Sequence, residues 1–372
     1  MTEKVEIIRS GDLYANDGLF GYAAWPTVTK LADGRLFAVF SAGRILHVCP
    51  FGKTVGCYSY DEGKTWTSPF VIADTPFDDR DGGVAVRGKQ VLVTTFNNTF
   101  AFQRAENERR ADGSIKNIIE DYIKCNQNAD NSLVGSWIYV SEDGGNTFPK
   151  RYRFPLTAPH GPIVLSDGSY FFVGRSFSVE ERYLENGVVT DYLPEGLYWS
   201  RSTDGYEWTE PSLIPIDAEN GDLWCEPHAF ERKDGGITVA VRVQKFSPVI
   251  GPLRTYLIDG SADGREWSSP RDLGLPASPP HILRHSSGAL VMTVGRREKP
   301  YAQQALISRD DGKTWSKPLN LETRMCSGDH GYPSSVDLSD GSIMTVFYRQ
   351  ENPGEKNRIS YVVWKLSEND RT

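Results

Sequence analysis

The chain has 372 residues and a formal net charge of −8, which argues against a nucleic-acid partner because such proteins normally present a basic face. Aromatic residues make up 12% of the chain and glycine occurs 35 times, a composition typical of many short strands joined by tight turns. The charged first residues, the five scattered cysteines and the lack of a membrane-length apolar run predict a cytoplasmic protein without membrane contact.

A short turn pattern recurs five times along the chain. Each copy has Ser, then Asp two positions later, then Gly and an aromatic residue, and the copies start at Ser59, Ser141, Ser202, Ser261 and Ser308. We expect each Asp to bond backbone N–H groups of its own turn, and each aromatic ring to pack between neighbouring sheets. The five Asp residues are therefore predicted to be structural.

A β-hairpin pattern alternates with these turns. Its six copies are residues 25–44, 81–97, 160–175, 226–242, 280–296 and 332–349. Each copy has two β-rich runs around a turn, as expected for the two inner strands of one propeller blade.

The last hairpin is followed by a single apolar run at residues 358–366 and by no further turn pattern. The N-terminal residues 4–10 are predicted to supply the missing strand, because joining the two chain ends removes open sheet edges. The sequence thus predicts one all-β domain over residues 1–372, a six-bladed β-propeller of four-stranded antiparallel blades.

Two insertions interrupt the pattern at about residues 101–135 and 178–195, each between the second and third strands of a blade. The first is expected to hold a short helix near residues 118–124. Both are expected to form a rim or lid beside a ligand site, with plain surface loops as the alternative.

Charged and aromatic residues gather where the hairpins open and close. The ends of all six hairpins are expected to meet near the axis, so these side chains would surround one pocket and repel one another unless a ligand intervened. The alternative for any single arginine is an ion pair that braces two blades. The candidate ligand-binding residues are Trp25, Arg44, His47, Arg80, His160, Arg175, His228, Arg242, His281, Arg296, His330 and Arg349.

The repeats resemble the Asp-box (BNR repeat) propellers of the sialidase superfamily over nearly the whole chain. Glu226 precedes the hairpin residue Asp234 by eight positions, and Arg242 follows it by eight. Tyr332 precedes Asp340 by eight positions in a Tyr-Pro-Ser-Ser context. The resemblance implies that Tyr332 is a nucleophile and Glu226 its base, since a phenol is a weak nucleophile at neutral pH without one. The Tyr nucleophile is a known exception to two-carboxylate glycoside hydrolysis.

The sequence departs from the sialidase pattern at three places. Ala24 stands where the first carboxylate-binding Arg is expected, and the third such position reads Lys299-Pro300-Tyr301. The loop at residues 45–60 holds no acidic residue before Asp61, although the family's acid/base Asp lies there. An altered substrate is therefore expected, and Trp25 is interpreted as a stacking platform for a sugar ring.

Protonation of the leaving group requires another acid, for which Asp81, Asp79, His47 and His160 are candidates. The main hypothesis is a retaining exo-glycoside hydrolase for a terminal sugar, acidic sugars included, with Tyr332, Glu226 and Asp81 as catalytic residues. The alternatives are a polysaccharide lyase or a histidine-based glycosidase, the latter with a His acid or an axial metal, and a non-catalytic carbohydrate- or protein-binding propeller. No cofactor or bound metal is predicted for the main hypothesis, and the expected partner is a carbohydrate.

Overall fold

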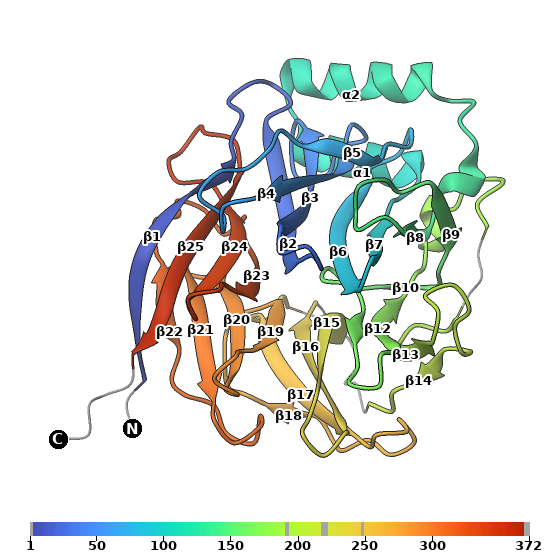
Figure 1. Ribbon diagram of the computed structural model, residues 1–372. Coiled ribbons are helices and arrows are strands. Elements are labelled where there is room, and N and C mark those ends of the chain that lie inside the picture. Colours follow the sequence, from blue (N-terminus) through green and yellow to red (C-terminus); the bar gives the residue numbers. More distant parts are fainter. Residues whose placement is uncertain (1–2, 190–192, 217–221, 247–248, 368–372) are drawn as a thin grey trace.

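Six antiparallel sheets stand around a common axis in the computed structural model, which describes residues 3–189, 193–216, 222–246 and 249–367 (Figure 1). The six-bladed, all-β propeller predicted from the repeats is confirmed. Every blade except the third has four strands in chain order from the axis outward, apart from the closing strand of the last blade, and in the third blade two short strands, β10 and β11, both pair with β12.

The strands of the first three blades are bounded as follows. Blade 1 contains β2 (Tyr22–Lys30), β3 (Leu36–Arg44), β4 (Lys53–Ser59) and β5 (Phe70–Ala73). Blade 2 contains β6 (Arg80–Arg87), β7 (Gln90–Phe96), β8 (Ser136–Ser141) and β9 (Lys150–Arg153). Blade 3 contains β10 (Leu156–Thr157), β11 (Ile163–Val164), β12 (Tyr170–Ser176), β13 (Leu197–Ser202) and β14 (Ser212–Leu213).

The other three blades follow the same plan. Blade 4 contains β15 (Asp222–Glu231), β16 (Ile237–Lys245), β17 (Arg254–Gly260) and β18 (Arg271–Asp272). Blade 5 contains β19 (Pro280–Arg284), β20 (Leu290–Arg296), β21 (Ala302–Ser308) and β22 (Leu319–Glu322). Blade 6 contains β23 (Gly331–Asp337), β24 (Ile343–Arg349), β25 (Arg358–Ser367) and β1 (Lys4–Tyr14).

The N-terminal strand closes the ring, as predicted. Strand β1 pairs antiparallel with β25, from Lys4 opposite Ser367 to Tyr14 opposite Ile359, so it is longer than the predicted residues 4–10. Figure 1 shows the two strands side by side at the left. Because the outermost strand comes from the other end of the chain, the ring opens only if this pairing is lost.

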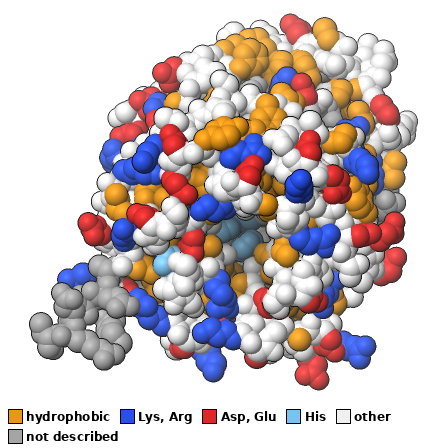
Figure 2. Space-filling view, in the orientation of Figure 1, with side chains coloured by type: hydrophobic (Ala, Val, Ile, Leu, Met, Phe, Trp, Pro, Cys, Tyr) orange, Lys and Arg blue, Asp and Glu red, His pale blue; other side chains and the backbone are white. Residues whose placement is uncertain are grey.

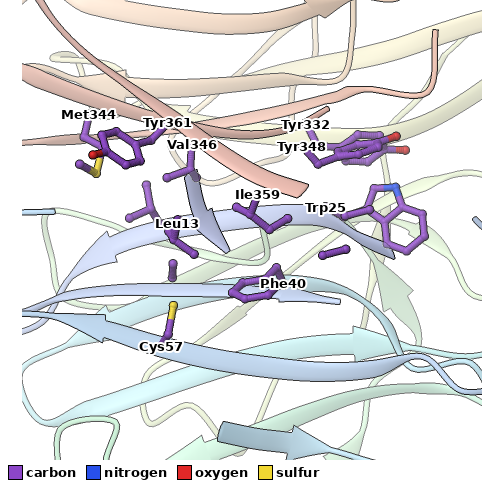
Figure 3. Close-up of a cluster of buried hydrophobic side chains, with 14 of the residues drawn as sticks. Leu13, Trp25, Phe40, Cys57, Tyr332, Met344, Val346, Tyr348, Ile359 and Tyr361 are labelled. Carbon is purple, nitrogen blue, oxygen red and sulfur yellow. The ribbon is translucent and has the colours of Figure 1, made fainter. Parts of the chain in front are cut away.

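The hydrophobic core lies between the blades. Among the described residues, one buried apolar cluster fills each of the six interfaces between neighbouring sheets. The middle strands are consequently buried on both faces, and every residue of β24 is buried. Figure 3 shows the cluster between blades 6 and 1, where Val346 and Ile359 lie near Leu13 and Phe40.

The five Ser-x-Asp turns join the outer two strands of blades 1–5, and their Asp side chains act locally as expected. Asp61 Oδ1 accepts hydrogen bonds from the backbone N–H of Thr65 at 2.8 Å and of Lys64 at 3.1 Å. The aromatic rings contact the neighbouring blade, since Phe148 stacks on Phe37 with 6.1 Å between ring centroids. These turns thus fasten the rim of the propeller.

The two insertions are more structured than predicted. The first contains α1 (Phe100–Arg110), α2 (Gly113–Cys125) and the short 3-10 helix η1 (Asn131–Leu133), and the second contains η2 (Glu181–Tyr183). They pack on each other: Thr99 Oγ1 donates a hydrogen bond to the Tyr183 carbonyl at 2.8 Å, and the Phe100 N–H donates one to Glu185 Oε2 at 3.1 Å.

A shared apolar cluster lies under both insertions, which therefore form one packed cap rather than two free loops. Residues 190–192 of the second insertion lie outside the described residues. In the part of the chain that the structure describes, no helix has the length and apolar character that a membrane crossing requires.

Candidate functional site

Four innermost strands carry a β-bulge at the same position, and a non-glycine residue in each bulge has positive φ. The residues are Trp25 (φ 55°), Asp81 (φ 58°), Glu226 (φ 54°) and Tyr332 (φ 51°). Each lies where the pairing of the first two strands of its blade shifts register. Left-handed backbone is unfavourable for such residues and clusters at functional sites. The repeated strain therefore marks these four positions as a site.

Tyr332, Glu226 and Arg242 form one hydrogen-bonded chain across the axis. The Tyr332 hydroxyl donates a short hydrogen bond to Glu226 Oε1, and Arg242 Nη1 donates to Glu226 Oε2 at 2.8 Å. Arg242 Nη2 is fixed by Gln244 Oε1 at 2.8 Å. Three residues from β15, β16 and β23, far apart along the chain, thus meet at one point as the hairpin pattern predicted.

Glu226 and Tyr332 have pKa values that are shifted in opposite directions. Burial alone would raise the pKa of Glu226, but Arg242 and the Tyr332 hydroxyl outweigh it and hold that pKa below its usual value. Burial and the Glu226 charge raise the pKa of Tyr332 well above its usual value. The phenol is therefore protonated at neutral pH and hydrogen-bonded to a carboxylate that can take its proton.

Asp81 is a buried carboxyl group next to this chain. Its side chain is 10% exposed, its Oδ1 has no hydrogen-bond partner among the described residues, and Arg80 Nε lies 4.0 Å away. Burial raises the pKa of Asp81 to about 7, with Arg80 opposing the shift and Glu226 adding to it. A carboxyl group that exchanges its proton near neutral pH suits general acid–base chemistry.

A cavity of about 380 Å³ lies between the propeller and the cap, and Tyr332 reaches it only through its hydrogen bond to Glu226, because Tyr332 itself is not a lining residue. Asp81, Glu226 and Arg242 line its inner side, and Arg175 lines it from blade 3. The insertions supply the opposite wall: Asn98, Phe102, Val179, Glu180 and Tyr183. The insertions are therefore a rim of this pocket.

Two of the predicted ligand-binding arginines are internal struts. Arg44 is 0% exposed and forms a bidentate ion pair with Asp78, with 3.0 Å between Nη2 and Oδ2. Arg349 is 3% exposed and pairs with Glu322 at 3.1 Å and Glu351 at 2.7 Å. The expectation that they contact a ligand is corrected, because buried carboxylates already occupy their donors.

The other predicted arginines differ in position. Arg175 lines the cavity and pairs with Glu195 at 2.8 Å. Arg80 stacks on Trp25 with 4.1 Å between its guanidinium carbon and the ring centre, and lies between Asp78 and Asp81. Arg296 borders a separate cavity near Tyr301 and does not line the pocket of Glu226.

Trp25 does not present a stacking platform. Its side chain is 1% exposed, since the guanidinium groups of Arg44 and Arg80 lie over its ring. Figure 3 shows its indole facing the rings of Tyr332 and Tyr348, with centroid distances of 6.4 and 6.2 Å. Trp25 instead packs against the ring of Tyr332.

Three predicted histidines form a buried cluster near the axis. The ring centroids of His160, His228 and His281 lie 4.5–5.7 Å apart. Figure 2 shows histidine side chains at the floor of a central hollow in the face turned to the viewer. Burial lowers the pKa of His228 to about 4 and those of the other two well below their usual value.

Two of these histidines link neighbouring blades through hydrogen bonds. His228 Nδ1 accepts from the Ile282 backbone N–H at 3.1 Å, and His281 Nδ1 accepts from that of Ser335 at 3.3 Å. Each bond joins one blade to the next. A neutral imidazole that accepts at Nδ1 carries its proton on Nε2, which leaves no lone pair for a metal. The structure describes no group of three or more ligands that could hold a metal ion in residues 3–189, 193–216, 222–246 and 249–367.

The acid candidates Asp79 and His47, and the ligand-binding candidate His330, lie outside the main pocket. Asp79, whose pKa burial raises to about 7, accepts from Thr75 Oγ1 at 3.0 Å and Asn97 Nδ2 at 3.1 Å. His330 is 0% exposed and bonded through Nδ1 to Gln303 at 2.9 Å. His47 borders a second cavity, as does Asp329. None of the three ring or carboxyl groups lines the cavity beside Glu226.

Neither Asp329 nor Arg297 was selected as a site residue from the sequence. Asp329 accepts hydrogen bonds from His47, Tyr22, Tyr348 and Asn357. Arg297 lies close enough to help lower the pKa of Glu226, and its Nε donates to the Gly328 carbonyl at 2.9 Å. The only sequence signal for Asp329 was its position three residues before Tyr332 at a hairpin opening.

Solved structures of other proteins have a similar fold. No family model and no curated protein matches the sequence. Among solved structures, NanB sialidase from Streptococcus pneumoniae has a TM-score of 0.63 and 14% identity, covering 98% of this chain and 70% of that one. The fold is that of the sialidases.

Two further structures bear on this sialidase-like propeller. Trypanosoma rangeli sialidase, in complex with the inhibitor DANA, has a TM-score of 0.58 and 15% identity over 96% of this chain and 58% of its own. A protein of unknown function from Dyadobacter fermentans has a TM-score of 0.74 and 17% identity, covering 98% of this chain and 99% of its own. At sequence identities this low, the structural similarity establishes the fold alone, and the chemistry must be argued from the residues of the site.

Proposed function

We propose that the protein is a retaining exo-glycoside hydrolase that removes a terminal, acidic sugar. The observation that carries the proposal is the chain Tyr332–Glu226–Arg242 beside a cavity that also holds Asp81. A hydrogen bond between Tyr332 and Glu226 supports catalysis over a binding-only propeller, which has no need of a phenol paired with a base.

In the first step, the Tyr332 Oη attacks the anomeric carbon while its proton passes to Glu226. Asp81 donates its proton to the glycosidic oxygen as the bond to the leaving group breaks. In the second step, Asp81 takes a proton from water, the water oxygen displaces Tyr332 from the sugar, and Glu226 returns the proton to Oη. Two displacements at one carbon retain its configuration.

Cavity size and charge support the substrate class. A volume of about 380 Å³ is at the small end of the roughly 300–1,000 Å³ found for ligand pockets, which favours one sugar residue over a longer chain. Arg175, whose side chain is 29% exposed, lines the cavity, and a guanidinium group suits a sugar carboxylate. A neutral phenol nucleophile avoids the repulsion that an anionic one would feel from that carboxylate.

The location is proposed to be cytoplasmic. All five cysteines are free thiols, as expected in a reducing compartment. Cys225 borders the cavity, but burial raises its pKa to about 12, so it is a protonated thiol and not a nucleophile at neutral pH.

A screen of aryl glycosides of acidic and neutral sugars, sialosides included, tests the proposal. We expect turnover of at least one acidic glycoside by the wild type. Tyr332→Phe keeps the ring and its packing but removes the nucleophile, so we expect kcat to fall at least about a thousandfold. Inertness toward all the glycosides, or unchanged kcat in the variant, would refute the assignment.

A further inference from the structure

The separate cavity near Tyr301, called here the blade 5 cavity, has a volume of about 500 Å³. It is bordered by the end of β20, by β21 and β22, and by the loops that precede β21 and follow β22. It shares no lining residue with the cavity beside Glu226. The lining residues that carry polar side chains are Arg296, Tyr301, Gln304, Lys317, Asn320 and Thr323.

The blade 5 cavity is positively charged in a protein that is acidic as a whole. The chain has 49 acidic residues against 41 lysines and arginines, yet Arg296 and Lys317 line this cavity and no acidic residue does. Among the described residues, Arg296 is the one arginine whose side chain has no hydrogen bond, ion pair or ring contact, and its Nε is buried. Because a buried charge is costly without a partner, this guanidinium group is suited to bind an anion.

An amide pair in the wall offers both a donor and an acceptor. Gln304 Nε2 donates to Asn320 Oδ1 at 2.9 Å, across paired positions of β21 and β22. The other two amide atoms, Gln304 Oε1 and Asn320 Nδ2, have no partner in the part of the chain that the structure describes, although Gln304 is only 6% exposed. An acceptor and a donor on one amide pair match a hydroxyl group, which both donates and accepts.

Strand geometry directs Arg296 and Gln304 to the same side of blade 5. Side chains two positions apart on a strand share a face, and Val294 and Leu306, two positions from Arg296 and Gln304, both belong to the apolar cluster between blades 4 and 5. The cavity therefore lies where this interface changes from apolar to polar side chains. Arg297, one position later, instead helps to lower the pKa of Glu226, so the two neighbouring arginines serve different sites.

These groups define the chemistry of a ligand. The partly buried guanidinium group of Arg296 matches the two oxygens and the single charge of a carboxylate. The amide pair and the hydroxyl groups of Tyr301 and Thr323 match several hydroxyl groups, while Pro300 and Met325 add apolar surface. The volume of about 500 Å³ lies within the range of roughly 300–1,000 Å³ for small-molecule pockets.

We propose that the blade 5 cavity binds a sugar acid, a ligand with one carboxylate and several hydroxyl groups, at a site separate from the reaction centre. Arg296 binds the carboxylate, and Gln304 with Asn320 binds a hydroxyl group. A free sugar acid and the terminal acidic residue of a glycan share this chemistry. The inference does not rest on the hydrolase function, because no residue of this cavity takes part in the proposed reaction.

Titration calorimetry on the full chain tests the site with glucuronate, methyl glucuronide, methyl glucoside and inorganic phosphate. We expect at least one of the two acids to bind, and methyl glucoside, which lacks the carboxylate, to bind at least about tenfold more weakly. Arg296→Met keeps the aliphatic stem and removes the charge, so the Kd of the acid should rise at least about tenfold. Arg265→Met is the matched control, because Arg265 is 85% exposed and does not line the cavity, and its Kd should equal that of the wild type.

The catalytic cavity is also proposed to take an acidic sugar, so the decisive quantity is the part of the binding that Arg296→Met removes. Asn320→Asp guards against loss of structure: it keeps an acceptor for Gln304 Nε2 but adds a negative charge beside the carboxylate. It should weaken binding to a similar extent and leave the thermal midpoint unchanged. Equal Kd values for glucuronate and methyl glucuronide would support the end of a glycan as the ligand, and weaker binding of the glycoside would support a free sugar acid.

Four results would overturn the proposal: no binding of either acid, tighter binding of phosphate than of both acids, equal Kd values for Arg296→Met and Arg265→Met, or an unchanged Kd in Asn320→Asp. Turnover of aryl glycosides is a separate measurement. If no glycoside is hydrolysed but binding depends on Arg296, the hydrolase function fails and the sugar-acid site stands.

Discussion

Replacing Asp81 by Asn should stabilise the protein and strongly slow its turnover. Burial raises the pKa of Asp81 from 3.8 to about 7, so the folded state holds this proton far more tightly than the unfolded chain does. The free energy of unfolding therefore falls as the pH rises from 3.8, and this loss is complete above about pH 7. Asn removes the titration and also tolerates the positive φ of 58° better than most residues.

The magnitude follows from the pKa difference. At about 1.4 kcal/mol per pKa unit, the penalty is about 1.5 kcal/mol at pH 5 and about 4 kcal/mol at pH 8. Urea unfolding of wild type and Asp81→Asn at both pH values measures it. The variant should gain more unfolding free energy at pH 8 than at pH 5, by about 2–3 kcal/mol.

Activity should move the other way. Without the acid, kcat should fall about 10²–10⁴-fold, and the wild-type rate should decline about tenfold per pH unit above pH 7 as Asp81 loses its proton. An equal or smaller gain in stability at pH 8 than at pH 5 would refute the assigned burial of the carboxyl. A wild-type rate that is flat from pH 7 to 9 would refute its role as acid.

Two further predictions concern buried groups away from the reaction. Burial lowers the pKa of His228 from 6.5 to about 4, so the folded state resists protonation and the unfolding free energy should fall by about 2 kcal/mol between pH 6.5 and 4.5 on account of this group. His228→Gln should show a correspondingly shallower pH dependence in urea titrations, and an unchanged slope would contradict the assignment. Arg44→Ala leaves Asp78 buried without its partner at 0% exposure and should cost about 3–5 kcal/mol, whereas Arg254→Ala, at an ion pair whose arginine is 51% exposed, should cost under about 1 kcal/mol; equal losses in the two variants would show that burial of the Arg44 pair is not the cause.

The fold was readable from the sequence because its signals are local and repeated. Each Ser-x-Asp turn fixes its own backbone, and each hairpin announces two strands, so counting them gave six blades. The phase of the hairpins then predicted that Glu226, Arg242 and Tyr332 converge, and they lie in hydrogen-bond contact. The helices α1 and α2 were underestimated because their packing depends on the other insertion, which no local pattern reveals.

The site was less predictable because strand ends do not reveal which side chains find a buried partner. Arg44 and Arg349 have the same register as Arg242, yet Asp78 and Glu322 pair with them inside the protein. Trp25 occupies the bulge position in blade 1 that Glu226 and Tyr332 occupy in blades 4 and 6, but two guanidinium groups cover its ring. Exposure at a propeller axis is decided by contacts between blades, and those lie hundreds of residues apart in some cases, as for Tyr22 and Asp329.

The central claim is that Tyr332 attacks the sugar with Glu226 as its base. A fluorinated glycoside of the best substrate, which slows the second displacement, would be incubated with the wild type, and the digested protein mapped by mass spectrometry. The mechanism predicts one glycosyl adduct, on the peptide that contains Tyr332, and no adduct in Tyr332→Phe. An adduct on another residue, or inactivation without any adduct on Tyr332, would contradict it.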